Sequence, residues 1–209
     1  MRTISVRCGM AIMAVAAVCV ALSSGFAEAQ TSGPTFEFAP LVLNQTPGAI
    51  VDEVDVGVLA HDVTFFGKHV ETGPDVNLEI RFLPPDFLAL IGSPRPMIGG
   101  DINTAGNTSD GYLGLTWGVS FIHDLLISGD SIYATAGLGG AVQDGYELTA
   151  PLGRKRLGSP VLFHLAAELG YQLTPSININ LFMDHMSNAN LAPRNAGVTN
   201  AGVRLGFKF

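Results

Sequence analysis

Residues 181–209 read LFMDHMSNANLAPRNAGVTNAGVRLGFKF, and this stretch decides the fold that we expect for the chain. Near each end of the stretch, apolar side chains recur at every second position, and the last of them is Phe209. Alternation with a period of two is typical of a β-strand with one apolar face. Residues 188–197, between the two alternating segments, contain three Asn, one Pro and one Gly and show no alternation, which favours a polar loop. We therefore expect two antiparallel strands joined by a loop.

The same alternation recurs along the chain, so that eight segments in all have one apolar and one polar face. They are residues 54–61, 76–82, 97–103, 112–121, 131–141, 161–172, 177–184 and 202–209. Eight strands of about this length predict an all-β fold, an eight-stranded antiparallel transmembrane β-barrel. Closure of the barrel would remove the exposed strand edges that lipid does not tolerate.

A water-soluble eight-stranded barrel is the alternative to a membrane barrel, and it would carry its apolar side chains inside. Two observations favour the membrane. The polar faces are rich in glycine and in charges of both signs, and Phe209 is in register with the apolar face. The charged side chains would then meet in the interior as packing of a narrow barrel; they are Glu79, Arg81, Asp101, His164, Glu168 and Arg204.

The first 29 residues are typical of a signal peptide. Arg2 and Arg7 precede the apolar run 9–22, and Ala27-Glu28-Ala29 fits a cleavage site. We expect cleavage there, a barrel domain over residues 30–209, and a location in the cell outer membrane. An uncleaved anchor helix is less favoured, because Ser23, Ser24 and Gly25 interrupt the apolar run.

Composition excludes several functions. Both cysteines, Cys8 and Cys19, lie in the expected signal peptide, so no disulfide or cysteine metal site is expected in the barrel. The formal net charge is −7, and it becomes −8 when Arg2, Arg7 and Glu28 are removed, which argues against a nucleic-acid partner. We found no metal cluster or phosphate-binding loop and expect no cofactor. Hydrophobic residues make up 47% of the chain, which is unusual for an ordinary secreted domain but suits a barrel with a lipid-facing wall.

The connections also yield expectations. With the amino terminus in the periplasm, the loops after the first, third, fifth and seventh strands lie outside the cell. Residues 83–94 could hold a short helix that begins after Pro84 and Pro85 and ends at Gly92. Residues 31–49 read as an irregular lead-in.

A histidine and a serine near the end of the seventh segment are candidates for chemistry. Parity puts His185 and Ser187 on the outer face and turns Asp184 inward. On the last strand, Thr199 has the parity of this outer face, so it should lie near His185. Polar side chains on a lipid-facing wall are costly, and a serine close to a histidine can be an activated nucleophile. Alternatively, the two residues mark where the strand leaves the membrane.

The stretch His185-x-Ser187-Asn188-Ala189, the loop after it and the terminal GVRLGFKF resemble the lipid A 3-O-deacylase family of outer-membrane barrels, and INTAG at 102–106 extends the likeness. The resemblance implies hydrolysis of an ester-linked acyl chain of lipid A. It implies that Ser187 is the nucleophile, His185 the general base and Asn188 an oxyanion donor.

The sequence departs from the family at two positions. Asn190 replaces a glycine that is common after the Ser-Asn-Ala stretch. The orienting acid of the family would fall on Thr199, and no Asp or Glu follows Asp184. A threonine hydroxyl could orient the histidine but supplies no charge. We therefore expect an activity that is weak, shifted in substrate or absent. Four cations of the outer loops would attract lipid A phosphates: Arg154, Lys155, Arg156 and Arg194. The alternative is that Arg154, Lys155 and Arg156 form an ordinary solvated loop, and Arg194 is the better placed of the four because it lies next to the site.

Further partners follow from a barrel of this kind. They are outer-membrane lipid, lipopolysaccharide and, through the last strand ending in Phe209, the barrel-assembly machinery. A homodimer stays open. Besides an esterase, two other functions are open: a non-catalytic structural, adhesive or lipopolysaccharide-binding barrel, and a narrow porin. The porin is least favoured because side chains fill the interior of an eight-stranded barrel.

Overall fold

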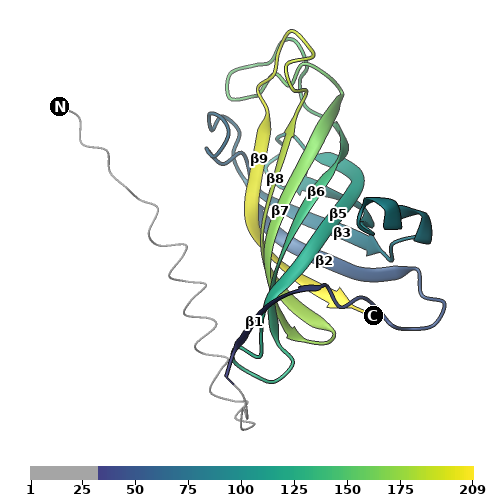
Figure 1. The fold of residues 1–209 in the computed structure, drawn as a ribbon. Helices are drawn as coiled ribbons and strands as arrows, with labels where there is room; N and C mark the ends of the chain where they lie inside the picture. The colour runs from purple at the N-terminus through teal and green to yellow at the C-terminus, as the bar shows by residue number, and fades with distance from the viewer. Residues whose placement is uncertain (1–32) are drawn as a thin grey trace.

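The computed structural model describes residues 33–209, so the expected signal peptide lies outside the described residues. The described chain is almost entirely β-structure (Figure 1). Its strands are β1 (Thr35–Pro40), β2 (Val51–Ala60), β3 (Pro74–Phe82), β4 (Arg95–Asn103), β5 (Asp110–His123), β6 (Ser131–Gln143), β7 (Val161–Thr174), β8 (Ile177–Ser187) and β9 (Val198–Lys208). Among these residues, no helix is long and apolar enough to cross a membrane.

Strands β2 to β9 form a closed antiparallel barrel, as the alternation predicts. Each strand pairs with its neighbours in the sequence, β2 pairs with β9, and the β5–β6 pairing completes the ring. Loops 61–73, 104–109, 144–160 and 188–197 gather at one end of the barrel, and β1 and the carboxyl terminus lie toward the other (Figure 1). The prediction of an eight-stranded barrel is confirmed.

Strand β1 corrects the expectation of an irregular lead-in. Its register runs from Thr35 opposite His123 to Pro40 opposite Val119 on β5. The pairing between β4 and β5 ends at Thr116, so the lower part of β5 would otherwise present an unpaired edge. A six-residue strand whose partner lies about 80 residues away leaves little local signal, which explains why the alternation alone did not reveal it.

The interior of the barrel is a polar network, as expected. Arg81 donates to Glu168 at 2.9 and 3.0 Å and to Glu79 at 2.6 Å, and Arg204 donates to Glu79 at 3.2 Å and to Glu168. These four side chains are almost completely buried. Buried charges are tolerated when opposite charges and hydrogen bonds surround them, so the network fills the narrow barrel at acceptable cost.

The connection between β3 and β4 contains the expected helix. Residues Asp86–Ile91 form a single 3₁₀ segment, η2, which follows Pro85 and ends at Gly92 in the left-handed conformation. The indole nitrogen of Trp117 donates to the carbonyl of Ile91 at 2.8 Å, so this connection rests against the outer side of β5.

At the loop end of the barrel, polar contacts tie three loops together. The Glu71 carboxylate accepts hydrogen bonds from the backbone of Thr108 (3.1 Å) and Lys155 (2.8 Å), from the Arg154 side chain (3.0 Å) and from His61 (3.1 Å). Burial alone would raise the pKa of Glu71, but these hydrogen bonds hold it below its usual range. Hydrogen bonds therefore hold loops 61–73, 104–109 and 144–160 together over this end of the barrel, which we call the loop end.

Candidate active site

The site forms where β8 leaves the barrel. His185 on β8 is paired in register with Thr199 on β9, and the His185 Nδ1 lies 2.8 Å from the Thr199 Oγ1. His185 and Ser187 are half-buried on the outer wall. Asp184 is buried in the interior, where its carboxylate meets His164 at 3.3 Å. The alternation of residues along β8 therefore predicted its two faces correctly, and it also predicted that His185 and Thr199 lie close together.

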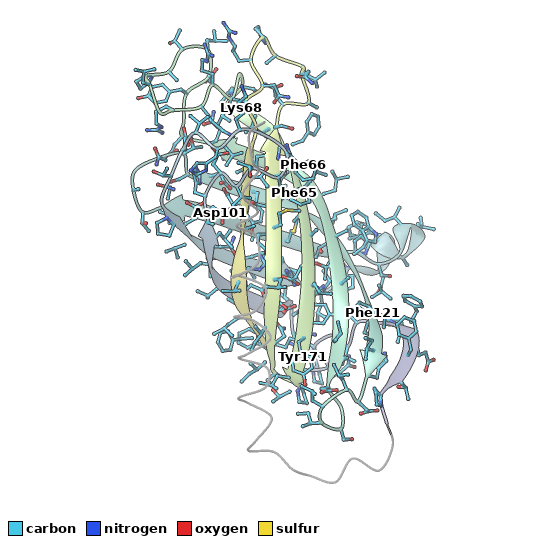
Figure 2. The ribbon with its side chains drawn as sticks, turned by 90° about the vertical axis from the view of Figure 1, so that its left-hand side faces the viewer. Phe65, Phe66, Lys68, Asp101, Phe121 and Tyr171 are labelled. Carbon is cyan, nitrogen blue, oxygen red and sulfur yellow. The ribbon has the colours of Figure 1, made fainter. Side chains whose placement is uncertain are left out.

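Loop 61–73 covers this part of the wall. The backbone nitrogen of Val63 donates to the Thr199 carbonyl at 2.7 Å, and the Phe66 ring contacts the His185 imidazole edge to face, with 5.2 Å between centroids. Phe65 and Phe66 lie over the upper ends of the strands, with Lys68 above them (Figure 2). Thr199 is consequently only 2% exposed, although its parity is that of the outer face.

Two hollows of about 320 and 330 Å³ meet at these residues, and Phe66, His185 and Ser187 line both of them. The first faces the loops, and we call it the polar hollow because it has the larger share of polar surface of the two. Its other lining residues are Gly67, Lys68, Val70, Lys155, Asn195, Ala196 and Gly197. The second, the apolar hollow, runs along β7 and β8. Its other lining residues are Leu165, Ala166, Ala167, Met183 and Asp184.

Comparison with known proteins identifies the family. The model of the family described as "Lipid A 3-O-deacylase (PagL)" matches residues 76–208, well over half of the chain. The chain belongs to this family. The match includes the whole of β8 and β9, and therefore the site residues on these strands, but it begins after loop 61–73.

One solved structure agrees with this barrel fold. The crystal structure of the outer membrane enzyme PagL shares 16% sequence identity, with 75% of this chain and 99% of that chain covered and a TM-score of 0.56. That of Neisserial surface protein A (NspA) shares 13% identity over 75% of this chain and 96% of that chain, at a TM-score of 0.43. No curated protein sequence matches. The barrel is thus an outer-membrane barrel of the lipid A 3-O-deacylase family.

Asn188, which the family resemblance suggested as an oxyanion donor, is buried next to the site and faces elsewhere. Its Nδ2 donates to the carbonyl of Leu157 at 2.7 Å and to that of Arg194. Its backbone nitrogen donates to the Asn195 side chain at 3.0 Å. A side-chain amide has two N–H donors, and both are used here to hold the loops together. In this arrangement, Asn188 supports the site without facing the hollows.

The four cations expected to attract phosphates have different surroundings. Arg154 bonds to Glu71 and, at 3.2 Å, to the Gly106 carbonyl. The Lys155 ammonium is buried, pairs with Asp62 and donates to the Gly197 carbonyl. The remaining two, Arg156 and Arg194, are exposed and line neither hollow. Of the four, only Lys155 lines a hollow, the polar one, and its side chain links three loops.

Phe66 and Lys68 were not among the site residues predicted from the sequence. Both lie in loop 61–73, more than 100 residues before His185, and no periodic pattern places a loop residue against a distant strand. The feature of the sequence that could have pointed to this loop is its pair of adjacent aromatic residues, Phe65 and Phe66. In the structure, 69% and 62% of their surfaces are exposed. Aromatic residues next to the outer end of a membrane strand are expected at the lipid interface, which is close to the site.

Proposed function

We propose that the protein hydrolyses an ester-linked acyl chain of lipid A in the outer leaflet, with Ser187 as nucleophile and His185 as general base. The observation that carries the proposal is the bonded pair of His185 and Thr199 beside Ser187, at the meeting point of a polar and an apolar hollow. An ester lipid has a polar headgroup and an apolar chain on opposite sides of the bond to be cut. The two hollows differ in the same sense, because the one on the loop side has the more polar lining.

The chemistry begins at the imidazole. With its Nδ1–H donated to the Thr199 hydroxyl, the Nε2 of His185 is free to accept the proton of Ser187. The Ser187 oxygen then attacks the ester carbonyl, and the tetrahedral intermediate collapses as the imidazolium returns the proton to the departing sugar oxygen. Water, deprotonated by the same imidazole, attacks the acyl-enzyme. The fatty acid leaves, and the serine recovers its proton.

The negative oxygen of the tetrahedral intermediate needs a hydrogen-bond donor. Asn195 lines the polar hollow, whereas the side chain of Asn188 has both donors engaged. The Nδ2 of Asn195 donates one hydrogen to Asn190 at 3.2 Å, and it has a second. Asn195 is therefore the better candidate for an oxyanion donor, and Asn188 holds the loop that carries it.

The apolar hollow suits the acyl chain. Leu165, Ala167 and Met183 on the outer faces of β7 and β8 line it, so a chain lying there would stay in contact with the barrel wall and the surrounding lipid. The small side chain of Ala167 lies between Leu165 and Leu169 on the outer row of β7, which leaves room for the chain.

Mass spectrometry of lipid A tests the proposal. The full-length protein is expressed in a Gram-negative host without its own lipid A deacylase, and lipid A should lose one acyl chain. Ser187→Ala and His185→Ala should abolish the loss, whereas Ser176→Ala, which removes a hydroxyl in the turn between β7 and β8, should not. Unchanged lipid A in cells that assemble the folded barrel would refute the proposal, as would an active Ser187→Ala.

A non-catalytic lipopolysaccharide-binding barrel is the second candidate, and the threonine at the position of the family's acid favours it. A hydroxyl lacks the charge that stabilises an imidazolium during acyl transfer. This candidate predicts that purified protein retains lipid A on a column without releasing fatty acid, and that Ser187→Ala retains it equally well.

A further inference from the structure

The polar hollow is positively charged. Two ammonium groups, those of Lys68 and Lys155, belong to residues that line it, and no carboxylate-bearing residue does. This contrasts with the chain as a whole, whose formal net charge is −7. The hollow contains the proposed nucleophile, and its charged lining residues are all lysines although the protein as a whole is acidic. Such a lining is suited to an anionic ligand.

The two lysines are not equivalent. The Lys155 ammonium is buried, forms an ion pair with Asp62 and donates to the carbonyl of Gly197, so its charge is largely compensated. The Lys68 side chain is exposed, and within residues 33–209 it makes no hydrogen bond or ion pair. An ammonium has three donors, all of which Lys68 can offer to a ligand. Lys68 is thus the cation of the polar hollow whose charge is uncompensated.

We propose that the polar hollow is a binding site for a phosphate group of the substrate and that Lys68 is the residue that contacts it. The inference rests on the proposed function, because the acyl chain in the apolar hollow and the ester at Ser187 direct the headgroup to the loop side of Phe66. The anionic groups of lipid A are its phosphates. Lys155 keeps the hollow in shape by joining loop 61–73 to loop 188–197.

The assignment to Lys68 differs from what the basic cluster in loop 144–160 suggests. Arg156 is also exposed and also carries a positive charge, yet it lines neither hollow. A general attraction of lipid A to the outer loops would depend on both residues alike. A bound phosphate in the polar hollow would depend on Lys68. This difference makes Arg156→Gln a matched control for Lys68→Gln.

The test compares Lys68→Gln, Lys68→Arg and Arg156→Gln with the unaltered protein in detergent micelles, with lipid A and with enzymatically dephosphorylated lipid A as substrates. With lipid A, Lys68→Gln should raise KM by about tenfold, because a hydrogen bond to a charged group is lost, and leave kcat nearly unchanged. With dephosphorylated lipid A, Lys68→Gln and the unaltered protein should have equal KM. Lys68→Arg should keep most of the affinity, and Arg156→Gln should behave like the unaltered protein.

Binding to Ser187→Ala separates this inference from the proposed function. Absence of fatty acid release from both substrates would end the proposed function, yet weaker binding of lipid A in Ser187→Ala/Lys68→Gln than in Ser187→Ala/Arg156→Gln would still support the phosphate site. Inorganic phosphate should weaken the binding of lipid A to Ser187→Ala/Arg156→Gln, which retains Lys68. It should not weaken the binding of dephosphorylated lipid A to the same variant. Equal affinities in the two double variants, or a Lys68 effect that persists without the phosphates, would overturn the inference.

Discussion

The imidazole of His185 and the hydroxyl of Thr199 lie 2.8 Å apart, on directly opposed residues of β8 and β9. A hydroxyl can accept the Nδ1–H of the imidazole or donate to a bare Nδ1, whereas a carboxylate can only accept. The first arrangement leaves Nε2 able to take a proton from Ser187, and the second does not. Thr199 therefore permits the productive tautomer without enforcing it, and it adds no charge to stabilise the imidazolium.

Thr199→Glu should raise activity. A carboxylate at this position would fix the tautomer and stabilise the imidazolium, and loss of the corresponding group in serine hydrolases costs up to about 10⁴ in kcat. We expect a gain of about tenfold or more in kcat on lipid A, with Thr199→Asp as the shorter variant in case the covered position is too small for glutamate. Thr199→Val, which removes the hydroxyl, should lower kcat. If both Thr199→Glu and Thr199→Asp assemble correctly as barrels and are less active than the unaltered protein, the role assigned to Thr199 beside His185 is wrong.

The sequence was sufficient to pair His185 with Thr199 because both lie on strands, where alternation fixes the face and a short connection fixes the neighbour. The interior network of Arg81 and Arg204 followed from the same rule. Loop 61–73 was beyond such reasoning. Its position over Thr199 depends on single contacts, such as that of Val63, between segments more than 130 residues apart. The contacts of Asn188 were unpredictable for the same reason, since its partners belong to loops.

Lys155→Met should loosen the cover of the site without unfolding the barrel. The ammonium is buried between Asp62 and Gly197, and removal of one partner from a buried ion pair costs about 3–5 kcal/mol. We expect faster amide hydrogen exchange in residues 61–73 and 188–197, lower kcat, and unchanged exchange in the strands. The double variant Asp62→Asn/Lys155→Met should be less damaged than Lys155→Met, because no unpaired charge remains. Equal exchange in all three proteins would show that the ion pair does not hold the loops.

The loop end should loosen as the pH rises. Burial would lower the pKa of His61, but hydrogen bonds to Asp75 and Glu71 outweigh it and raise the pKa from 6.5 to about 9. A raised pKa in the folded state gives stability that is fully present below pH 6.5 and is lost as the pH rises through about 9. The pKa of Glu71 is lowered, so its contribution to stability is fully present above about pH 4.5 and is lost only as the pH falls below that value. It therefore does not change the loop end in the alkaline range.

Limited proteolysis of loop 61–73 between pH 6 and 10 measures this effect. Cleavage should accelerate toward pH 10 in the unaltered protein, after correction for the protease's own pH dependence on an unfolded peptide. His61→Gln cannot be protonated, so its loop should be cleaved faster at pH 6 and show little further change. A loop that is cleaved at the same corrected rate at pH 6 and pH 10 would argue against a protonated His61 in the bonded loop end.

Glu168→Gln should weaken the barrel and spare the site. Glu168 accepts two hydrogen bonds from Arg81, at 2.9 and 3.0 Å, and one from Arg204, so its neutral analogue leaves two buried guanidinium groups with less compensating charge. The expected loss is about 3–5 kcal/mol, visible as a lower urea midpoint for unfolding from micelles. Because Glu168 faces the interior and His185 faces outward, activity per folded molecule should be unchanged. Glu147→Gln, at an exposed loop position, is the matched control and should not shift the midpoint. A barrel of unaltered stability would mean that the remaining carboxylates suffice for both arginines.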